Sequence, residues 1–234
     1  MRDRMKSYLV FAGARYRLAV YLLMPAVLLG IGLWVEGKLG SGNGGVGAIV
    51  VTVLLPMAEI SSDNWLFGGI QAKDSMGLEY LKASGRGMGI LKNALWMDLA
   101  RKFLSALGII ALHRLAAALA WGWEAGGAPG SRPGIAHSWP GNAGSAVGVL
   151  LYFVLVAYIV SALGTFLSRF GDMFWMNLLI SYGAVFLAAF ALMLLNLAEH
   201  IFIIDIMCMA LGVAVSVLTV QVAMKRVERS YYDK

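Results

Sequence analysis

The apolar stretch VGVLLYFVLVAYIVSALGTFL occupies residues 147–167 and holds no charged side chain. A transmembrane helix needs about 20 such residues to cross the hydrocarbon core of a bilayer. The whole chain has this character, because 60% of its 234 residues are hydrophobic, 14% are charged and its mean hydropathy is +0.75. This composition excludes a water-soluble globule and a disordered chain, and it predicts an integral membrane protein. The one cysteine, Cys208, excludes a disulfide framework.

Six apolar runs are long enough, or nearly long enough, to cross a membrane. They cover residues 18–35, 46–61, 103–121, 147–167, 173–195 and 202–223. Each run is predicted to be a helix, because lipid offers no hydrogen-bond partners to open backbone groups. The predicted fold class is therefore an all-α integral membrane protein, with six transmembrane helices in a single domain over residues 1–234. The first run is too long for the apolar region of a secretory signal peptide.

Basic residues lie mostly on one side of these predicted spans. Of the 19 Lys and Arg residues, 16 lie in the N-terminal segment, in the loop 62–102, in the turn before the fifth run and in the C-terminal tail. The opposite side keeps Lys38 and Arg132, and Arg114 lies within the third run. The positive-inside rule then places both termini in the cytoplasm. We expect a multi-pass protein of the cell (plasma) membrane.

Three segments outside the predicted spans have different amino-acid patterns. Residues 1–17 place apolar and basic side chains at helical spacing, which favours an amphipathic helix at the inner interface over a frayed basic tail. The cytoplasmic loop 62–102 has two stretches near helical spacing, separated by Gly85, Gly87 and Gly89. It is predicted to hold two short helices around a hinge and to dock a partner, unless it merely packs beneath the bundle. The extracellular loop 122–146 is predicted to lack regular structure.

Motifs of catalysis are missing from the sequence. There is no phosphate-binding loop, no H-E-x-x-H metal motif and no G-x-S-x-G nucleophile elbow, and the three histidines stand apart. We therefore expect no catalytic residue, no metal site and no cofactor in this chain.

Polar residues inside the predicted spans are the remaining candidates for a site, because each is costly in lipid. An ion pair between Arg114 and Asp205 is our hypothesis for a tie between the third and sixth spans; the alternative is that Arg114 reaches the headgroups alone. Polar side chains of the fourth and fifth spans could line a path or simply join helices. They are Tyr158, Ser161, Thr165, Asn177, Ser181 and Tyr182.

Two stretches of the inner loop resemble a segment of known membrane proteins. The stretches DNWLFGGIQ at 63–71 and GLEYLK at 77–82 look like the loop of small permeases of peptide exporters, among them exporters of phenol-soluble modulins and lantibiotics. In architecture the whole chain resembles the permease subunits of ABC-2 type ATP-binding cassette exporters. It departs from larger members in one respect: only residues 196–201 separate the last two runs, so re-entrant outer helices are short or missing.

This resemblance implies a transporter subunit with no ATPase activity of its own. Its partners would be an ATP-binding cassette ATPase subunit that holds ATP and Mg, a second permease copy or a related permease, and lipid, but no nucleic acid. The cargo would be an amphipathic peptide or another hydrophobic molecule, exported by alternating access. The ATPase-coupling residues would be Asp74, Gly77, Leu78, Glu79, Tyr80, Leu81, Lys82 and Arg86. The alternatives are a non-transporting immunity or scaffold protein and a membrane-embedded enzyme.

Overall fold

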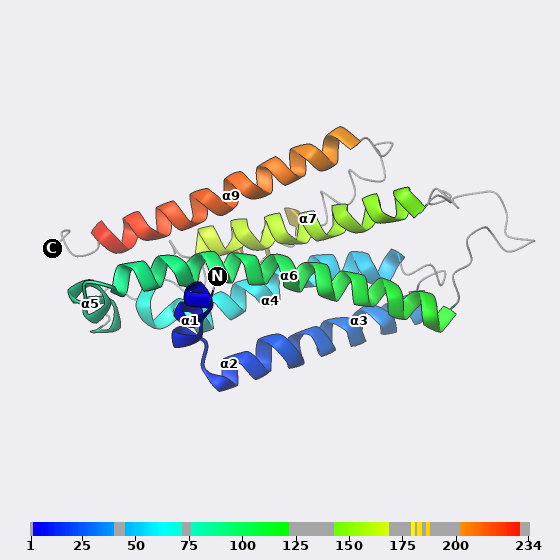
Figure 1. Ribbon diagram of the computed structural model, residues 1–234. Helices are drawn as coiled ribbons and strands as arrows, with labels where there is room; N and C mark the ends of the chain where they lie inside the picture. Colours follow the sequence, from blue (N-terminus) through cyan, green and yellow to red (C-terminus); the bar gives the residue numbers. More distant parts are fainter. Residues whose placement is uncertain are drawn as a thin grey trace, which may run out of the picture.

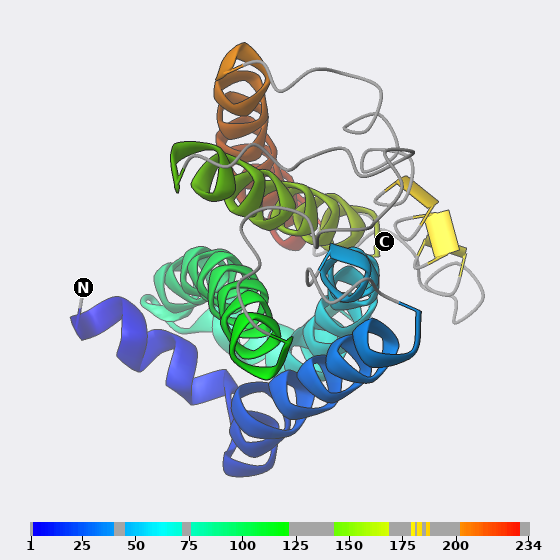
Figure 2. The ribbon, with the colours of Figure 1, turned by 90° about the vertical axis from the view of Figure 1, so that its right-hand side faces the viewer.

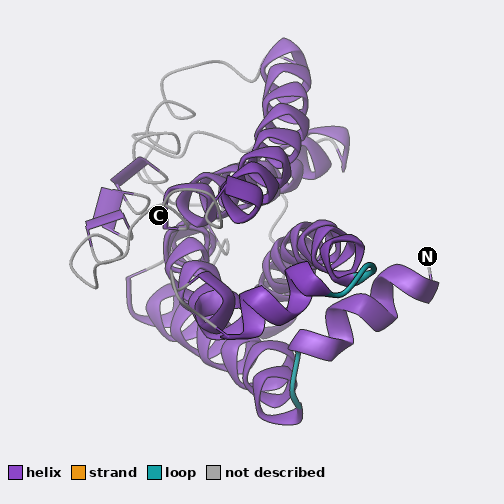
Figure 3. Ribbon diagram, turned by 90° about the vertical axis from the view of Figure 1, so that its left-hand side faces the viewer, coloured by secondary structure: helices purple, strands orange, loops and turns teal. Residues whose placement is uncertain are grey.

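The computed structural model describes residues 2–39, 45–71, 76–121, 143–168 and 202–229, with isolated helical residues between 179 and 187. The described residues are almost all helical, with no strand among them (Figure 3). The predicted all-helical fold class is therefore confirmed for the described part of the chain. Of the predicted segments, the extracellular loop lies almost wholly outside it, and so does most of the fifth span.

The described chain begins with four helical segments, and a break at Gly13 separates the first from the other three. Helix α1 (Arg2–Phe11) is followed by Ala12 and by Gly13, which has an extended backbone and precedes α2 (Ala14–Leu18). A π-helical segment, η1 (Ala19–Leu23), then leads directly into α3 (Met24–Leu39). Residues 14–39 thus form one apolar helix, and α1 folds back from it onto the bundle (Figure 1).

The remaining helices are long, apart from α5. They are α4 (Gly45–Gln71), α5 (Met76–Ala83), α6 (Gly87–Trp121), α7 (Ala143–Ser168) and α9 (Phe202–Arg229). Within the described part of the chain, three helical stretches are long and apolar enough to cross a membrane: Ala14–Leu39, Gly45–Phe67 and Gly87–Ala120. Shorter apolar stretches lie in α7 and α9, at Leu150–Thr165 and Met209–Lys225. These helices indicate an integral membrane protein.

The predicted inner loop is largely helical. Its first residues continue α4 as far as Gln71, and its last residues belong to α6, which starts at Gly87. The expectation of two short helices around a glycine hinge is therefore only half right, because the second is the beginning of a 35-residue helix. The physical reason is that polar residues of α4 and α6 pair with each other, so the helices need not end where their apolar runs end.

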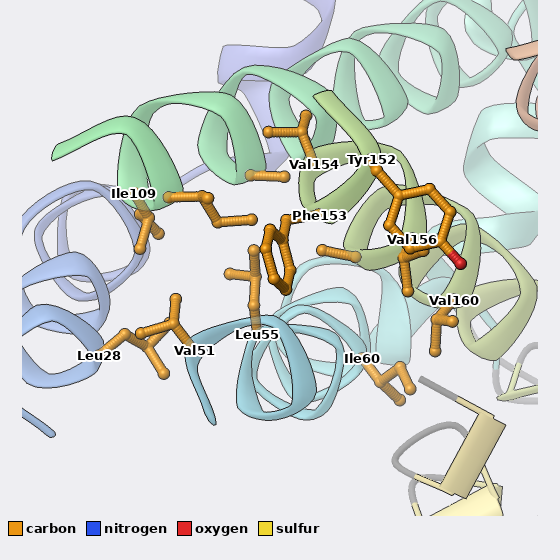
Figure 4. Packing of buried hydrophobic residues seen from close by; sticks show 13 residues of the cluster. Leu28, Val51, Leu55, Ile60, Ile109, Tyr152, Phe153, Val154, Val156 and Val160 are labelled. Atoms are coloured by element: carbon orange, nitrogen blue, oxygen red, sulfur yellow. The ribbon is translucent and has the colours of Figure 1, made fainter. Parts of the chain in front are cut away.

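The bundle is built around α4, α6 and α7. Helix α4 lies between α3 and α7, α1 packs on α6, and α9 packs mainly on α7 (Figure 2). One apolar core joins α3, α4, α6 and α7 through residues such as Leu28, Leu55, Ile109 and Phe153 (Figure 4). Many large apolar side chains face outward, for example Leu119 at 79% exposure, as a bundle surrounded by lipid requires.

A second apolar core lies toward the end of the bundle that carries α1 and α5 (Figure 1). Tyr8 and Tyr16 contribute to it from α1 and α2, Phe67 from α4, and Leu95 from α6. Of the apolar residues predicted to line one face of an N-terminal helix, Tyr8, Ala12 and Tyr16 are buried, whereas Met5 and Leu9 are exposed. The N-terminal segment therefore meets the bundle on one side only.

Candidate functional site

Helix α5 is a short amphipathic helix held between α4 and α6. Glu79 lies in its first turn and Lys82 in its last, where each charge opposes the partial charge of the helix end. The helix closes with hydrogen bonds from the Ser84 amide to the Tyr80 carbonyl at 3.0 Å and from the Ser84 hydroxyl to the Leu81 carbonyl at 3.1 Å. These bonds satisfy carbonyls that the helix end would otherwise leave open.

Gly87 makes the turn from α5 into α6 possible. Its amide donates to the Ser84 carbonyl at 3.0 Å, and a Cβ atom at this position would lie 2.0 Å from the Leu81 carbonyl oxygen. No other residue fits that approach without moving the backbone. The neighbouring Gly85 and Gly89 have open space around the same position. Of the three glycines predicted to form the hinge, Gly87 is thus the one whose Cβ the structure excludes.

The outer face of α5 is apolar and exposed. Met76 and Tyr80 are one helical turn apart, with 87% and 77% of their surfaces exposed. Gly77, Glu79 and Arg86 are also exposed, while Leu81 and Lys82 are partly buried. Burial lowers the pKa of the Lys82 ammonium, and the nearby Glu79 carboxylate raises it in part. Of the other predicted coupling residues, Asp74 and the Leu78 side chain lie outside the described part of the structure.

The helices on either side of α5 share a buried network of charges, which has Arg101 at its centre. The Arg101 Nη2 and Nη1 atoms donate to the two carboxylate oxygens of Glu59 at 2.5 and 3.2 Å. The same side chain donates to Asp98 Oδ1, at 3.2 Å from Nε and 3.1 Å from Nη2. Two carboxylates from two helices therefore hold one guanidinium in a fixed orientation.

Ser62 completes this half of the network. Its hydroxyl oxygen accepts from Arg101 Nη2 at 3.2 Å and donates to the Glu59 carbonyl at 2.8 Å. Glu59, Asp98 and Arg101 are all at least 95% buried. A buried charge is tolerated only when it is paired and hydrogen-bonded, and this arrangement meets both conditions.

Lys102 forms the other half of the network and extends it to α7. Its Nζ atom lies 2.8 Å from Asp98 Oδ2 and 3.2 Å from Asp63 Oδ1, and it donates to Thr165 Oγ1 at 2.7 Å. The Thr165 hydroxyl donates to the Ser161 carbonyl at 2.7 Å, and its oxygen accepts the hydrogen bond from the ammonium. Charges and hydroxyls thus connect α4, α6 and α7 at one level of the bundle.

Two tyrosines close the network on the side of α1 and α2. The Tyr8 hydroxyl donates to that of Tyr16 at 3.3 Å, and both rings are buried. Burial raises the pKa of the Tyr8 phenol well above its ordinary value, with the Arg101 charge acting in the opposite direction. The N-terminal segment therefore contacts the charged network through two buried tyrosine rings, and the Tyr8 phenol keeps its proton.

In the sequence, Arg101 and Lys102 are two of many basic residues of the predicted inner loop, and Glu59 is one polar residue near the end of the second apolar run. The available signal was a pair of helical spacings: Glu59 with Asp63, and Asp98 with Arg101 and Lys102. Such spacing places these side chains on one face of each helix. Only the tertiary structure shows that the two faces contact each other.

A smaller polar site lies toward the other end of the bundle. The Gly47 amide donates to Glu36 Oε2 at 2.8 Å, and the imidazole of His113, fully buried, packs against Gly32 and Gly47. Arg114 lies within electrostatic range of Glu36. Its proposed partner Asp205 has a side chain outside the described part of the structure, so the Arg114–Asp205 pair stays a prediction.

The predicted path-lining residues divide into three groups. Tyr158 of α7 shares a hydrogen bond with Ser216 of α9, and the hydroxyls of Ser161 and Thr165 bond to the backbone one turn earlier. These three act as connections within and between helices. Tyr182 is exposed, and Asn177 and Ser181 lie outside the described residues.

The described side chains include no group of three or more His, Cys, Asp or Glu placed to hold a metal ion. Comparison of the chain with protein-family models, with curated proteins and with solved structures finds no match.

Proposed function

We propose that this chain is the permease subunit of an ATP-driven exporter, and that α5 is the helix through which a separate ATPase subunit acts on it. The observation that carries the proposal is the exposed pair Met76 and Tyr80 on a helix built between two long, apolar helices. An exposed apolar face on a segment outside the membrane is costly in water, which favours burial against a partner.

The buried network supports the same proposal. Arg101 and Lys102 of α6 are bound to carboxylates of α4, and Lys102 is bound to Thr165 of α7. A displacement of α5 would therefore move the connected ends of these helices together. This is the rigid-body type of transition on which alternating access depends.

The proposal includes a topology of six spans with both termini in the cytoplasm. In the arrangement of the helices, α1, α5 and the C-terminal end of α9 lie toward one end of the bundle (Figure 1). These are the basic segments that the positive-inside rule assigns to the cytoplasm. The cargo is an amphipathic peptide or another hydrophobic molecule, the transport path includes a second permease copy or a related permease, and ATP and Mg bind to the ATPase partner.

Co-purification tests this proposal. Tagged protein from its native host should retain an ATPase, and Met76→Ala with Tyr80→Ala should release it. A matched control is Tyr21→Ala with Met207→Ala, which removes one exposed tyrosine and one exposed methionine from other helices. Retention of the ATPase by the α5 variant would contradict the proposal, and a retained partner without ATPase activity would favour a scaffold protein instead.

A further inference from the structure

A groove of about 490 Å³ lies between the first turns of α6 and the last turns of α9. Its walls combine two kinds of side chain. Met88 and Trp96 of α6 and Met224 of α9 are apolar and partly buried, whereas Lys92, Lys225 and Glu228 are charged and exposed. The groove is thus amphipathic, with an apolar bed and a charged rim.

In the topology proposed above, Trp121 and Phe202 lie toward the outer interface, and the two helices then carry this rim beyond the hydrocarbon core. Lys92 is 29 residues before Trp121, the last residue of α6, and Lys225 is 23 residues after Phe202, the first of α9. At 1.5 Å per residue these separations are about 44 and 35 Å, and both exceed the core thickness of about 30 Å. Trp96 lies one turn closer to the core than Lys92, at the level where indole rings are favoured.

Charge decides which ligand suits such a groove. Lys92 and Lys225 carry two positive charges and Glu228 carries one negative charge, which leaves one positive charge in excess. A headgroup with a single phosphodiester charge neutralises this excess, and its acyl chains can lie on the apolar bed. Basic pockets between transmembrane helices on the cytoplasmic side are known to hold anionic headgroups.

We infer that the groove between α6 and α9 binds one anionic phospholipid of the inner leaflet, with Lys92 and Lys225 at its phosphate and Trp96 beside its glycerol region. The inner-leaflet position depends on the membrane orientation proposed above. The binding itself does not depend on the exporter function, so the two can fail separately.

Native mass spectrometry of the purified full chain in detergent tests the inference. The probes are phosphatidylglycerol and phosphatidylcholine with identical acyl chains. Wild-type protein should retain one phosphatidylglycerol in preference to phosphatidylcholine. The variant Lys92→Gln with Lys225→Gln should bind phosphatidylglycerol roughly 10- to 30-fold more weakly, since each lysine near a charged lipid surface contributes about a factor of five.

The matched control is Lys6→Gln with Lys38→Gln, which removes two exposed lysines that do not line the groove. It should retain phosphatidylglycerol as the wild type does. Trp96→Ala should weaken retention of both lipids, because it removes part of the apolar bed. Circular dichroism of each variant checks that the helices persist.

Three results would overturn the inference. One is equal retention of phosphatidylglycerol by the groove variant and the control. Another is equal retention of the two lipids by wild-type protein. The third is displacement of phosphatidylglycerol by millimolar inorganic phosphate or by an acidic peptide, because the groove would then bind a soluble anion rather than a lipid.

Discussion

Arg101 of α6 holds both carboxylate oxygens of Glu59 of α4, a residue 42 positions earlier in the chain, at a site where each side chain is at most 4% exposed. This pair is the shortest ionic contact of the buried network, and it joins the two helices that flank α5.

Removing one partner of this pair leaves the other charge buried. Glu59→Gln should destabilise the protein by about 3–5 kcal/mol, because Arg101 would then have only Asp98 to balance it. Thermal unfolding in detergent measures the loss. Glu79→Gln, at an exposed position of α5, should change the unfolding temperature little. Equal behaviour of the two variants would show that the network does not stabilise the bundle.

Thr165 has a role in the network that a second threonine lacks. Its hydroxyl bonds to the backbone one turn earlier, as does that of Thr219 in α9, but its oxygen also accepts from Lys102. Thr165→Val should therefore lower the free energy of unfolding by about 1–3 kcal/mol, because a buried charge loses an acceptor. Thr219→Val should lower it by less. Chemical unfolding of both variants compares the two effects, and a larger loss from Thr219→Val would contradict the assignment.

Gly87 should not tolerate a side chain. In Gly87→Ala, the new Cβ would meet the Leu81 carbonyl at 2.0 Å, so the turn between α5 and α6 must open. We expect faster amide hydrogen exchange across residues 76–86 and loss of the ATPase partner. Gly85→Ala and Gly89→Ala introduce the same methyl group into open space and should leave exchange unchanged. Slow exchange in Gly87→Ala would refute this account of the turn.

Gly32 permits the close approach of α3 to α4 and α6. A Cβ at this position would lie 2.6 Å from the Val51 side chain and 2.7 Å from the His113 ring. Gly32→Ala should therefore destabilise the bundle by about 1–3 kcal/mol. In Gly30→Ala, two residues earlier on α3, the methyl group meets open space, so this variant should be neutral or up to about 1 kcal/mol more stable. Thermal unfolding that shows no difference between the two would contradict the close packing.

Because the phenol of Tyr8 is buried, the free energy of unfolding should fall as the pH rises through the alkaline range. Burial raises the pKa of this phenol in the folded protein, whereas in the unfolded chain the pKa is about 10. Below pH 10 both states keep the proton, and above it only the unfolded state releases it, so stability falls as pH rises. The difference in free energy of unfolding between wild type and Tyr8→Phe should therefore shrink between pH 9 and 11. The exposed Tyr80→Phe provides the control, and a constant difference for Tyr8→Phe would count against burial of the phenol.

The part of the fold that could be predicted is the part that depends on local composition. Apolar runs such as residues 103–121 predict helices without any knowledge of their neighbours, because lipid forces the backbone to satisfy itself within each segment. The ends of the helices are harder to predict from the sequence. The apolar runs stop at Ser61 and begin again at Phe103, but α4 continues to Gln71 and α6 already begins at Gly87. The charged residues there form pairs across helices, and a pattern read along one helix does not contain its partner.

The candidate site likewise has one part that the sequence predicts and one part that it does not. The short helix α5 was predictable from its own spacing of apolar and charged residues, including the exposed Tyr80 and Glu79. The network of Glu59, Arg101 and Lys102 was not, because Lys102 meets Thr165 from 63 positions away.

The amino-acid sequence by itself determined the helical, membrane-embedded class of this protein, since hydrophobicity and hydrogen-bond satisfaction act on each segment separately. Only the tertiary structure decided which of its few charged residues are buried together and which remain exposed. That choice depends on how helices pack, because a buried carboxylate is tolerable only where another helix brings a cation within hydrogen-bonding distance.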